Sequence, residues 1–174
     1  FNFSRDGFLD LYYIKAKESW QEESYDLDRF EVSGGIQLTK WFSLAGQFIR
    51  REGIYYDAVP SFKGKGYETA LLLAFQPNKN INQQVSLYHS DLSRNKEELY
   101  DVDILYSRTT YQFNKYFFLR AVLQYNTYEK RLLTDFLASF TLIPGTVLHI
   151  GYGGLYESRE WQDNRWLYGQ GDLL

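Results

Sequence analysis

The chain of 174 residues contains no cysteine and no methionine, and it has only three prolines. The absence of cysteine excludes disulfides, so in an oxidising compartment the fold is held by its backbone ladder and needs no covalent staples. The absence of methionine means that residue 1 is not a translation start. We therefore expect a processed protein or a piece of a longer one.

A long apolar run and an excess of positive charge are also missing. No stretch approaches the roughly 18 consecutive apolar residues that a membrane helix needs, and the mean hydropathy is −0.45. The net charge of −3 leaves no basic surface for nucleic acid. These absences exclude a helical membrane protein and a partner that is nucleic acid.

What the chain does contain is alternation of apolar and polar residues along its whole length. Phe30, Val32 and Ile36 fall on one side of a strand, and Glu31 and Ser33 fall on the other. A period of two gives a strand one apolar and one polar face. Aromatic residues make up 19% of the chain, more than a soluble core of this size needs. Membrane β-barrels use such residues at both water interfaces.

The pattern predicts an all-β fold of about nine antiparallel strands, connected up and down. The predicted strands are 8–17, 30–39, 42–51, 66–76, 82–91, 99–111, 116–126, 133–143 and 146–156. Ten residues at about 3.3 Å each, tilted by about 40°, rise about 25 Å, which is the height of the apolar band of an outer-membrane barrel. The sequence therefore favours a transmembrane β-barrel.

Short and long connections alternate along the chain. Short ones are predicted at 39–41, 77–81, 112–115 and 144–146, and long charged ones at 18–29, 52–64, 92–98, 127–132 and after residue 157. In outer-membrane barrels the periplasmic turns are short and the extracellular loops are long. We therefore place the charged connections on the outside, facing lipopolysaccharide.

The strand count has a consequence for the domain. Bacterial barrels have even strand numbers, and lipid tolerates no unpaired strand edge. We therefore interpret residues 1–174 as one barrel segment that lacks the final strand and further N-terminal strands. Closure then requires strands from the rest of its own polypeptide or from a partner chain.

Pairing registers predict which side chains face inward. Pairing Ile143 with Val147 around a three-residue turn puts Gly145 at positive φ and His149 opposite Thr141. An odd pairing sum for strands 99–111 and 116–126 gives a lipid-facing set of Tyr100, Val102, Ile104, Tyr106, Leu119, Ala121, Leu123 and Tyr125. The predicted polar residues of the lumen are then Asp101, Asp103, Ser107, Arg120, Gln124, Asn126 and His149.

Aromatic residues gather at both ends of the predicted strands. Beside the short turns lie Trp41, Phe42, Phe75, Tyr116 and Phe117, and beside the long loops lie Trp20, Tyr55, Tyr56, Tyr128 and Tyr156. Two belts one strand length apart are typical of aromatic girdles at membrane interfaces. A soluble sandwich with aromatic strand ends is the alternative interpretation.

The sequence offers few residues for catalysis. His149 and Ser139 supply two parts of a hydrolase site, but no residue at suitable spacing would orient the histidine. Asp101 and Asp103 lie about 7 Å apart along one strand face, a separation that suits the acid and base of an inverting glycosidase. A lumen of mixed charge explains these residues more simply, and we assign no catalytic residue.

The loops offer two further candidates. Two acidic groups could hold divalent cations: Glu22, Glu23, Asp26 and Asp28, and then Glu157, Glu160 and Asp163. Neither group has the spacing of a dedicated calcium loop, so we interpret both as solvated faces and predict no metal site. Trp161 and Trp166, with Arg159 and Arg165, form either a ligand-stacking surface or the start of the upper girdle, which we favour.

Two stretches carry a family likeness: YQFNKYFFLRAVLQYN at 111–126 and PGTVLHIGYGGLY at 144–156. They resemble the C-terminal barrel of a family of uncharacterised outer-membrane proteins of Gram-negative bacteria, chiefly Bacteroidetes. The resemblance implies a large barrel that follows an N-terminal module similar to family 9 carbohydrate-binding domains. It also implies a last strand rich in Phe, Lys and Tyr that this chain lacks. The family provides no catalytic residues to carry over.

From these observations we expect the wall of a bacterial outer-membrane pore, or a barrel that anchors a displayed domain linked to carbohydrate handling. We expect no enzyme activity and no cofactor. The expected partners are outer-membrane lipid, lipopolysaccharide and the remaining strands of the barrel. The alternatives are an outer-membrane hydrolase with catalytic residues in the lumen or at its rim, and a soluble lipocalin-like binding barrel.

Overall fold

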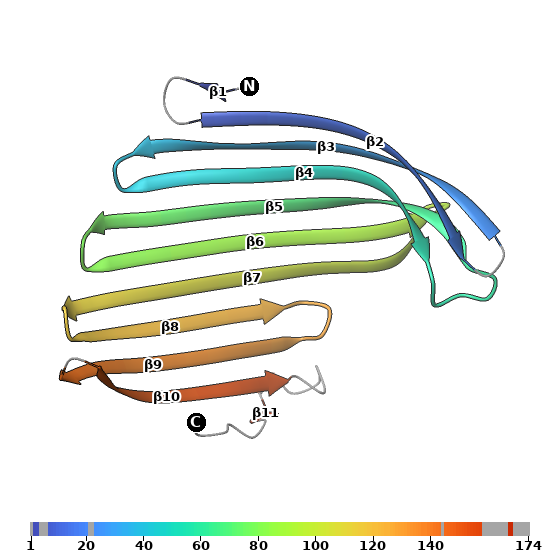
Figure 1. Cartoon of the computed structure of the whole chain (residues 1–174). Helices are drawn as coiled ribbons and strands as arrows, with labels where there is room; N and C mark the ends of the chain where they lie inside the picture. Colours follow the sequence, from blue (N-terminus) through green and yellow to red (C-terminus); the bar gives the residue numbers. More distant parts are fainter. Residues whose placement is uncertain (1, 4–6, 21–22, 144, 158–166, 169–174) are drawn as a thin grey trace.

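The structure is a computed structural model that describes residues 2–3, 7–20, 23–143, 145–157 and 167–168. Its strands are β1 (Asn2–Phe3), β2 (Gly7–Trp20), β3 (Glu23–Thr39), β4 (Phe42–Tyr55), β5 (Phe62–Asn78), β6 (Ile81–Arg94), β7 (Glu97–Asn114), β8 (Phe117–Asn126), β9 (Arg131–Ile143), β10 (Thr146–Glu157) and β11 (Leu167–Tyr168). They form one antiparallel sheet in chain order. Figure 1 shows this sheet as a single layer. No helix among these residues is long and apolar enough to cross a membrane.

The predicted set of nine antiparallel up-and-down strands is confirmed by β2 to β10.

The short turns lie where the sequence places them, because their residues supply the required hydrogen bonds. The side-chain oxygen of Asn78 accepts hydrogen bonds from two backbone N–H groups of its turn, and Asn114 does the same in the turn between β7 and β8. Asn before a tight turn commonly acts in this way. Gly145 has the predicted positive φ, at 88°.

The predicted long loops are mostly wrong, because most of their residues continue the strands. The region 18–29 is almost entirely strand, since β2 ends at Trp20 and β3 begins at Glu23. Lys15 pairs with Asp28 across these strands, and Lys17 pairs with Asp26. Opposite charges on facing positions stabilise a strand pair that is not apolar. Strand ends predicted from hydrophobic alternation alone therefore fall short of the observed ends of β2 and β3.

The other long connections shorten in the same way. The predicted loop 92–98 is a turn of two residues, Asn95 and Lys96, with φ of 52° and 71°. Two positive φ values are the signature of the type I′ turn that suits a hairpin. The loop 52–64 contracts to residues 56–61, and the loop 127–132 contracts to residues 127–130.

The sheet is open within the part of the chain that the structure describes. β2 and β10 lie at opposite sides of the sheet in Figure 1 and are not neighbours in the strand order. Pairing between residues 8–17 and 146–156, which would have made a complete small barrel, is therefore not observed among the described residues. That further strands close the sheet stays a prediction.

Strand pairing divides the middle of the sheet into two faces. One row runs across five strands through Leu71, Leu87, Leu105, Tyr125 and Leu132. We call this side the apolar face; it also carries Leu44, Leu73, Val85, Leu119, Leu123, Phe136, Leu148 and Ile150. The other side, the polar face, carries Glu31, Gln47, Gln84, Arg108, Arg120 and Asp135, with aliphatic and aromatic residues between them.

Buried apolar side chains are confined to one end of the sheet. Among the described residues only Ile49, Ile54 and Leu92 are buried hydrophobic residues. We call this end the packed tip: residues 49–55 of β4, 62–68 of β5, 89–94 of β6 and 97–103 of β7. The parts of β2 to β10 between the packed tip and the short turns are the open belt. Figure 1 shows the ends of the long strands bending at the tip.

Candidate functional site

The polar face of the open belt is organised by arginines and their partners. Arg108 donates to the side-chain oxygen of Gln84 at 2.6 Å, and Arg120 lies 3.6 Å from the carboxylate of Asp135. On β3 and β4, Gln47 donates to Glu31 at 2.5 Å, and Glu31 also pairs with an arginine at 3.0 Å. Long side chains on this face therefore bind one another, while the Nε atoms of its arginines at 29, 108 and 120 are buried without a hydrogen-bond partner among the described residues.

Four of the predicted lumen residues share the polar face. Arg120, Gln124 and Asn126 alternate along β8, and the pairing of β8, β9 and β10 places His149 on the same side. The side-chain oxygen of Asn126 is used locally, because it accepts hydrogen bonds from two backbone N–H groups of the turn that follows. Whether this face lines a lumen stays a prediction.

The other three predicted lumen residues, Asp101, Asp103 and Ser107, lie on the apolar face, so the prediction that all seven share one face is wrong. Leu105 pairs with Tyr125, so the pairing sum of β7 and β8 is even and not odd. The cause is a register shift between Gln112 and Asn114 at the turn, which strand alternation does not reveal. Consequently Tyr100, Val102, Ile104 and Tyr106 point to the polar face, contrary to the predicted lipid-facing set.

Ser107 is tolerated on the apolar face because its neighbours are polar. The amide of Gln83 donates to the hydroxyl of Ser107 at 3.0 Å, and Thr109 donates to the same Gln83 side chain. The three side chains satisfy each other, so none is left as an unpaired polar group among apolar neighbours.

His149 lies opposite Ser139, two residues from the predicted partner Thr141. The turn at Gly145 contains two residues and not three, and a register shift between Thr146 and Val147 moves the pairing by one more residue. The even pairing sum, and with it the predicted face, is retained. Ser139 is only 3% exposed, whereas His149 is exposed. No hydrogen bond joins the two side chains, and no third group orients the imidazole, within the described residues. A nucleophile and base need both features.

The aromatic belt beside the short turns contains two groups of ring contacts. Trp41 meets Phe75 edge-on, with ring centroids 5.3 Å apart. Phe117 stacks on Phe113 at 4.7 Å and on Phe140 at 4.2 Å. The sequence analysis missed Phe113 and Phe140, which the pairing of β7, β8 and β9 brings to the same height. Phe42 pairs with Phe75, and Tyr116 lies exposed in the adjoining turn.

The upper belt differs from the predicted one. Tyr55 and Tyr56 lie beyond the belt, where Tyr55 contacts Phe62 and Tyr56 contacts Trp20. Tyr128 is exposed in a turn, and Tyr156 lies near the end of β10. The row that borders the open belt consists instead of Tyr13, Phe30, Phe48 and Tyr67. The predicted upper belt differs because β2 to β5 are longer than predicted, so their ends lie beyond the border of the open belt.

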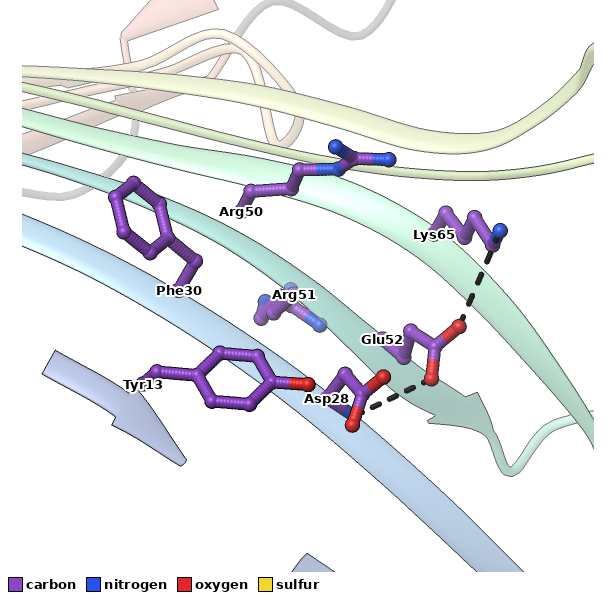
Figure 2. Close-up of a pocket in the computed structure, with 7 residues that line it drawn as sticks. All are labelled: Tyr13, Asp28, Phe30, Arg50, Arg51, Glu52 and Lys65. Carbon is purple, nitrogen blue, oxygen red and sulfur yellow. Dashed lines mark hydrogen bonds and ion pairs between the residues drawn. The ribbon is translucent and has the colours of Figure 1, made fainter. Parts of the chain in front are cut away.

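A cavity of about 260 Å³ lies on this border. Figure 2 shows Tyr13 and Phe30 beside charged side chains, with the hydroxyl of Tyr13 pointing toward Asp28. Glu52 accepts a hydrogen bond from Lys63 at 3.0 Å and one from the backbone N–H of Asp28 at 3.2 Å. Burial alone would raise the pKa of Glu52, but these hydrogen bonds and the nearby lysines lower it.

The packed tip holds a second polar network, on the polar face. Arg51 donates to the hydroxyl of Tyr100 at 2.6 Å, forms a short ion pair with Glu68 and lies 3.4 Å from the hydroxyl of Ser90. Burial would lower the pKa of Arg51, but the bonds to Tyr100 and Glu68 raise it. The guanidinium therefore ties β4, β5, β6 and β7 together.

Close backbone approach makes this network possible. A Cβ on Gly66 would lie 2.0 Å from the backbone oxygen of Asp91, so only glycine fits there. Leu92 is 2% exposed, and its side chain packs where Gly53 and Gly64 leave room.

Asp101 and Asp103 are brought together with His89, a grouping that the sequence analysis did not find. The imidazole Nδ1 lies 2.9 Å from a carboxylate oxygen of Asp103 and 3.8 Å from one of Asp101. The sequence contains no sign of this grouping, because His89 lies on β6 and only the register of β6 and β7 places it opposite Asp103.

Several loop residues of the sequence analysis lie outside the described residues: Glu22, Arg159, Glu160, Trp161, Asp163, Arg165 and Trp166. Of the two acidic groups, Asp26 and Asp28 pair with lysines across β2 and β3. Glu157 pairs with Arg131 at 2.9 Å. Lysines therefore face Asp26 and Asp28 across the strands, and an ion pair accounts for Glu157.

No family model, curated protein or solved structure matches this chain.

Proposed function

We propose that this chain forms part of the wall of a bacterial outer-membrane β-barrel, with the apolar face toward the acyl chains and the polar face toward the interior. The observation that carries the proposal is the near absence of an apolar core. Among the described residues only three hydrophobic side chains are buried, whereas Leu87, Leu105, Leu123 and Phe136 of the apolar face are each more than 40% exposed.

The energetics favour an apolar environment for this face. Burying one large aliphatic or aromatic side chain contributes about 1.5–3 kcal/mol. A soluble domain obtains this energy by packing two layers against each other, but the described strands form one layer. Acyl chains would cover the apolar face without a second protein layer.

The dimensions of the belt suit a bilayer. Between Tyr67 of the upper aromatic row and Phe75 of the lower one, β5 advances eight residues, or about 27 Å along the strand. A tilt of about 40° reduces this to about 20 Å, which is near the apolar height of about 25 Å in outer-membrane barrels. Charged residues lie beyond the upper row, where Lys15 pairs with Asp28 and Glu52 pairs with Lys65.

Closure of the wall would require more strands. Lipid leaves no water for unpaired N–H and C=O groups, so membrane sheets close on themselves. The partners that we propose are strands from the rest of the polypeptide or from a partner chain, together with outer-membrane lipid and lipopolysaccharide. Arg108 and Arg120 would then line an interior suited to polar solutes, and the family resemblance suggests a link to carbohydrate handling.

Vesicle binding tests the proposal. The full chain should gain β-structure, measured by circular dichroism, when it is refolded with phosphatidylcholine vesicles, and it should float with them in a density gradient. Leu123→Arg should float less, whereas Gln124→Arg should float like the unmodified chain. A folded, monodisperse protein that remains in buffer and does not float would contradict the proposal and favour a soluble barrel.

A further inference from the structure

At the packed tip, one imidazole and three carboxylates form a square on the same side as the apolar face. His89 and Asp91 alternate along β6, and Asp103 and Asp101 lie directly opposite them on β7. The Nδ1 atom of His89 and one oxygen each of Asp101 and Asp103 all lie within 4.8 Å of one another. Their side chains are 38%, 45% and 59% exposed, so a solute can reach them.

The square brings three carboxylates together, and the imidazole of His89 lies against two of them. On the β5 side, the uncharged Thr69 pairs with His89. Like charges directly opposite each other destabilise a strand pair, and Asp91 lies opposite Asp101. A bound cation would remove this repulsion.

The spacing of the donor atoms fits one metal ion. Zinc binds imidazole nitrogen and carboxylate oxygen at about 2.0–2.2 Å, which puts two tetrahedral ligands about 3.4 Å apart. The observed separations of 2.9 Å and 3.8 Å from Nδ1 to the two oxygens lie on either side of that value. A small change of side-chain torsion would bring all three atoms to one ion.

The backbone around the donors is fixed by neighbouring strands. The N–H of Asp103 donates to the hydroxyl of Thr127 at 2.8 Å, and the backbone N–H of Thr127 donates to the carbonyl of Asp103 at 3.0 Å. One oxygen of Asp91 accepts a hydrogen bond from the backbone N–H of Tyr67. Asp91 is thereby held beside the site, where it contributes charge.

We propose that His89, Asp101 and Asp103 bind a divalent transition-metal ion of the zinc type. The imidazole selects against Ca²⁺ and Mg²⁺, which prefer oxygen ligands. Three protein ligands leave one coordination position for water or a solute. Because the ligands come from β6 and β7, the ion links two strands at the packed tip. This inference does not depend on the membrane proposal.

Metal titration of the folded full chain tests the inference. Zn²⁺ should bind with a stoichiometry of one by isothermal titration calorimetry, and Co²⁺ should give the visible absorption of a nitrogen-ligated site. His89→Ala and Asp101→Asn should each weaken binding at least about tenfold. Circular dichroism would verify that each variant keeps its β-structure.

Matched controls keep the test specific. His149→Ala removes the only other histidine, and Asp135→Asn removes an aspartate that is paired with an arginine. Both should bind Zn²⁺ as the unmodified chain does. Equal Zn²⁺ binding by His89→Ala and the unmodified chain, equal affinity for Ca²⁺ and Zn²⁺, or no binding at all would each overturn the assignment.

Discussion

The packed tip and the open belt belong to the same strands but are stabilised in different ways. In the tip, Leu92 is 2% exposed, and Arg51 bonds to partners on three other strands. In the belt, Leu123 is 42% exposed and Leu105 is 43% exposed, although both lie in the middle of paired strands. The tip thus buries apolar side chains and bonds the Arg51 guanidinium within the chain, whereas the belt leaves its apolar side chains exposed.

This difference separates two contributions to stability. Backbone ladders connect β2 to β10 along their lengths and are common to both regions. Among the described residues, buried hydrophobic side chains occur only in the tip. The belt should therefore be sensitive to lipid and to the face on which a substitution lies, and the tip should be sensitive to cavities and lost hydrogen bonds wherever the chain is folded.

The largest effect is expected in the tip. Leu92→Ala should lower the free energy of unfolding by about 2–5 kcal/mol, because it leaves a cavity among buried neighbours. Denaturant titration of the chain refolded in vesicles would measure the loss. Leu142→Ala is the control, since Leu142 is 64% exposed, and its cost should be smaller. Equal costs would show that the tip is no better packed than the belt.

The belt is tested by a pair of adjacent substitutions. Leu123→Arg should cost about 2–4 kcal/mol in lipid, because a charge would enter the acyl region. Gln124→Arg should be tolerated, since Gln124 points to the polar face. Unfolding in vesicles measures both values. Equal losses would refute the assignment of the two faces.

A smaller effect is expected from the network of the tip. Tyr100→Phe should cost about 1.5–3 kcal/mol, because it removes a hydrogen bond to the charged Arg51. Tyr106→Phe is the matched control on the same face of β7, because the hydroxyl of Tyr106 makes no hydrogen bond with the described residues. The two variants should differ in their denaturant midpoints, and identical midpoints would mean that the Arg51 network adds nothing.

The smallest effect is expected at a turn. Asn114→Ala should cost about 0.5–1.5 kcal/mol, because the hydrogen bonds to two backbone N–H groups are lost. Asn114→Asp keeps an acceptor oxygen and should recover most of the stability in the same unfolding experiment. A failure of Asp to recover it would show that the turn does not depend on this acceptor.

Much of the fold could be predicted from local patterns. The alternation around Phe30 to Ile36 and the turn residues Asn114 and Gly145 each act within a few residues, so the sequence shows them directly. The ends of the strands could not be found in this way, because pairs such as Lys15 with Asp28 stabilise β2 and β3 without apolar residues. Cross-strand charge pairs become visible only when the pairing is known.

The grouping of His89, Asp101 and Asp103 could not be predicted either, because it depends on strand registers that the sequence does not reveal. One register shift between Gln112 and Asn114 moves Asp101 and Asp103 from one face to the other relative to β8. Their grouping with His89 depends on a second register, that of β6 and β7. Spacing along one strand therefore identified the two aspartates but neither their face nor their partner.

The central claim is that acyl chains cover the apolar face, and accessibility scanning tests it most directly. The chain has no cysteine, so cysteines introduced one at a time at residues 119 to 126 of β8 carry a spin label at one known place. In vesicles, collision with oxygen, which concentrates among acyl chains, should peak at 119, 121, 123 and 125. Collision with a water-soluble nickel complex should peak at the even positions between them. Nickel accessibility that is equal at odd and even positions, or highest at the odd ones, would contradict the account.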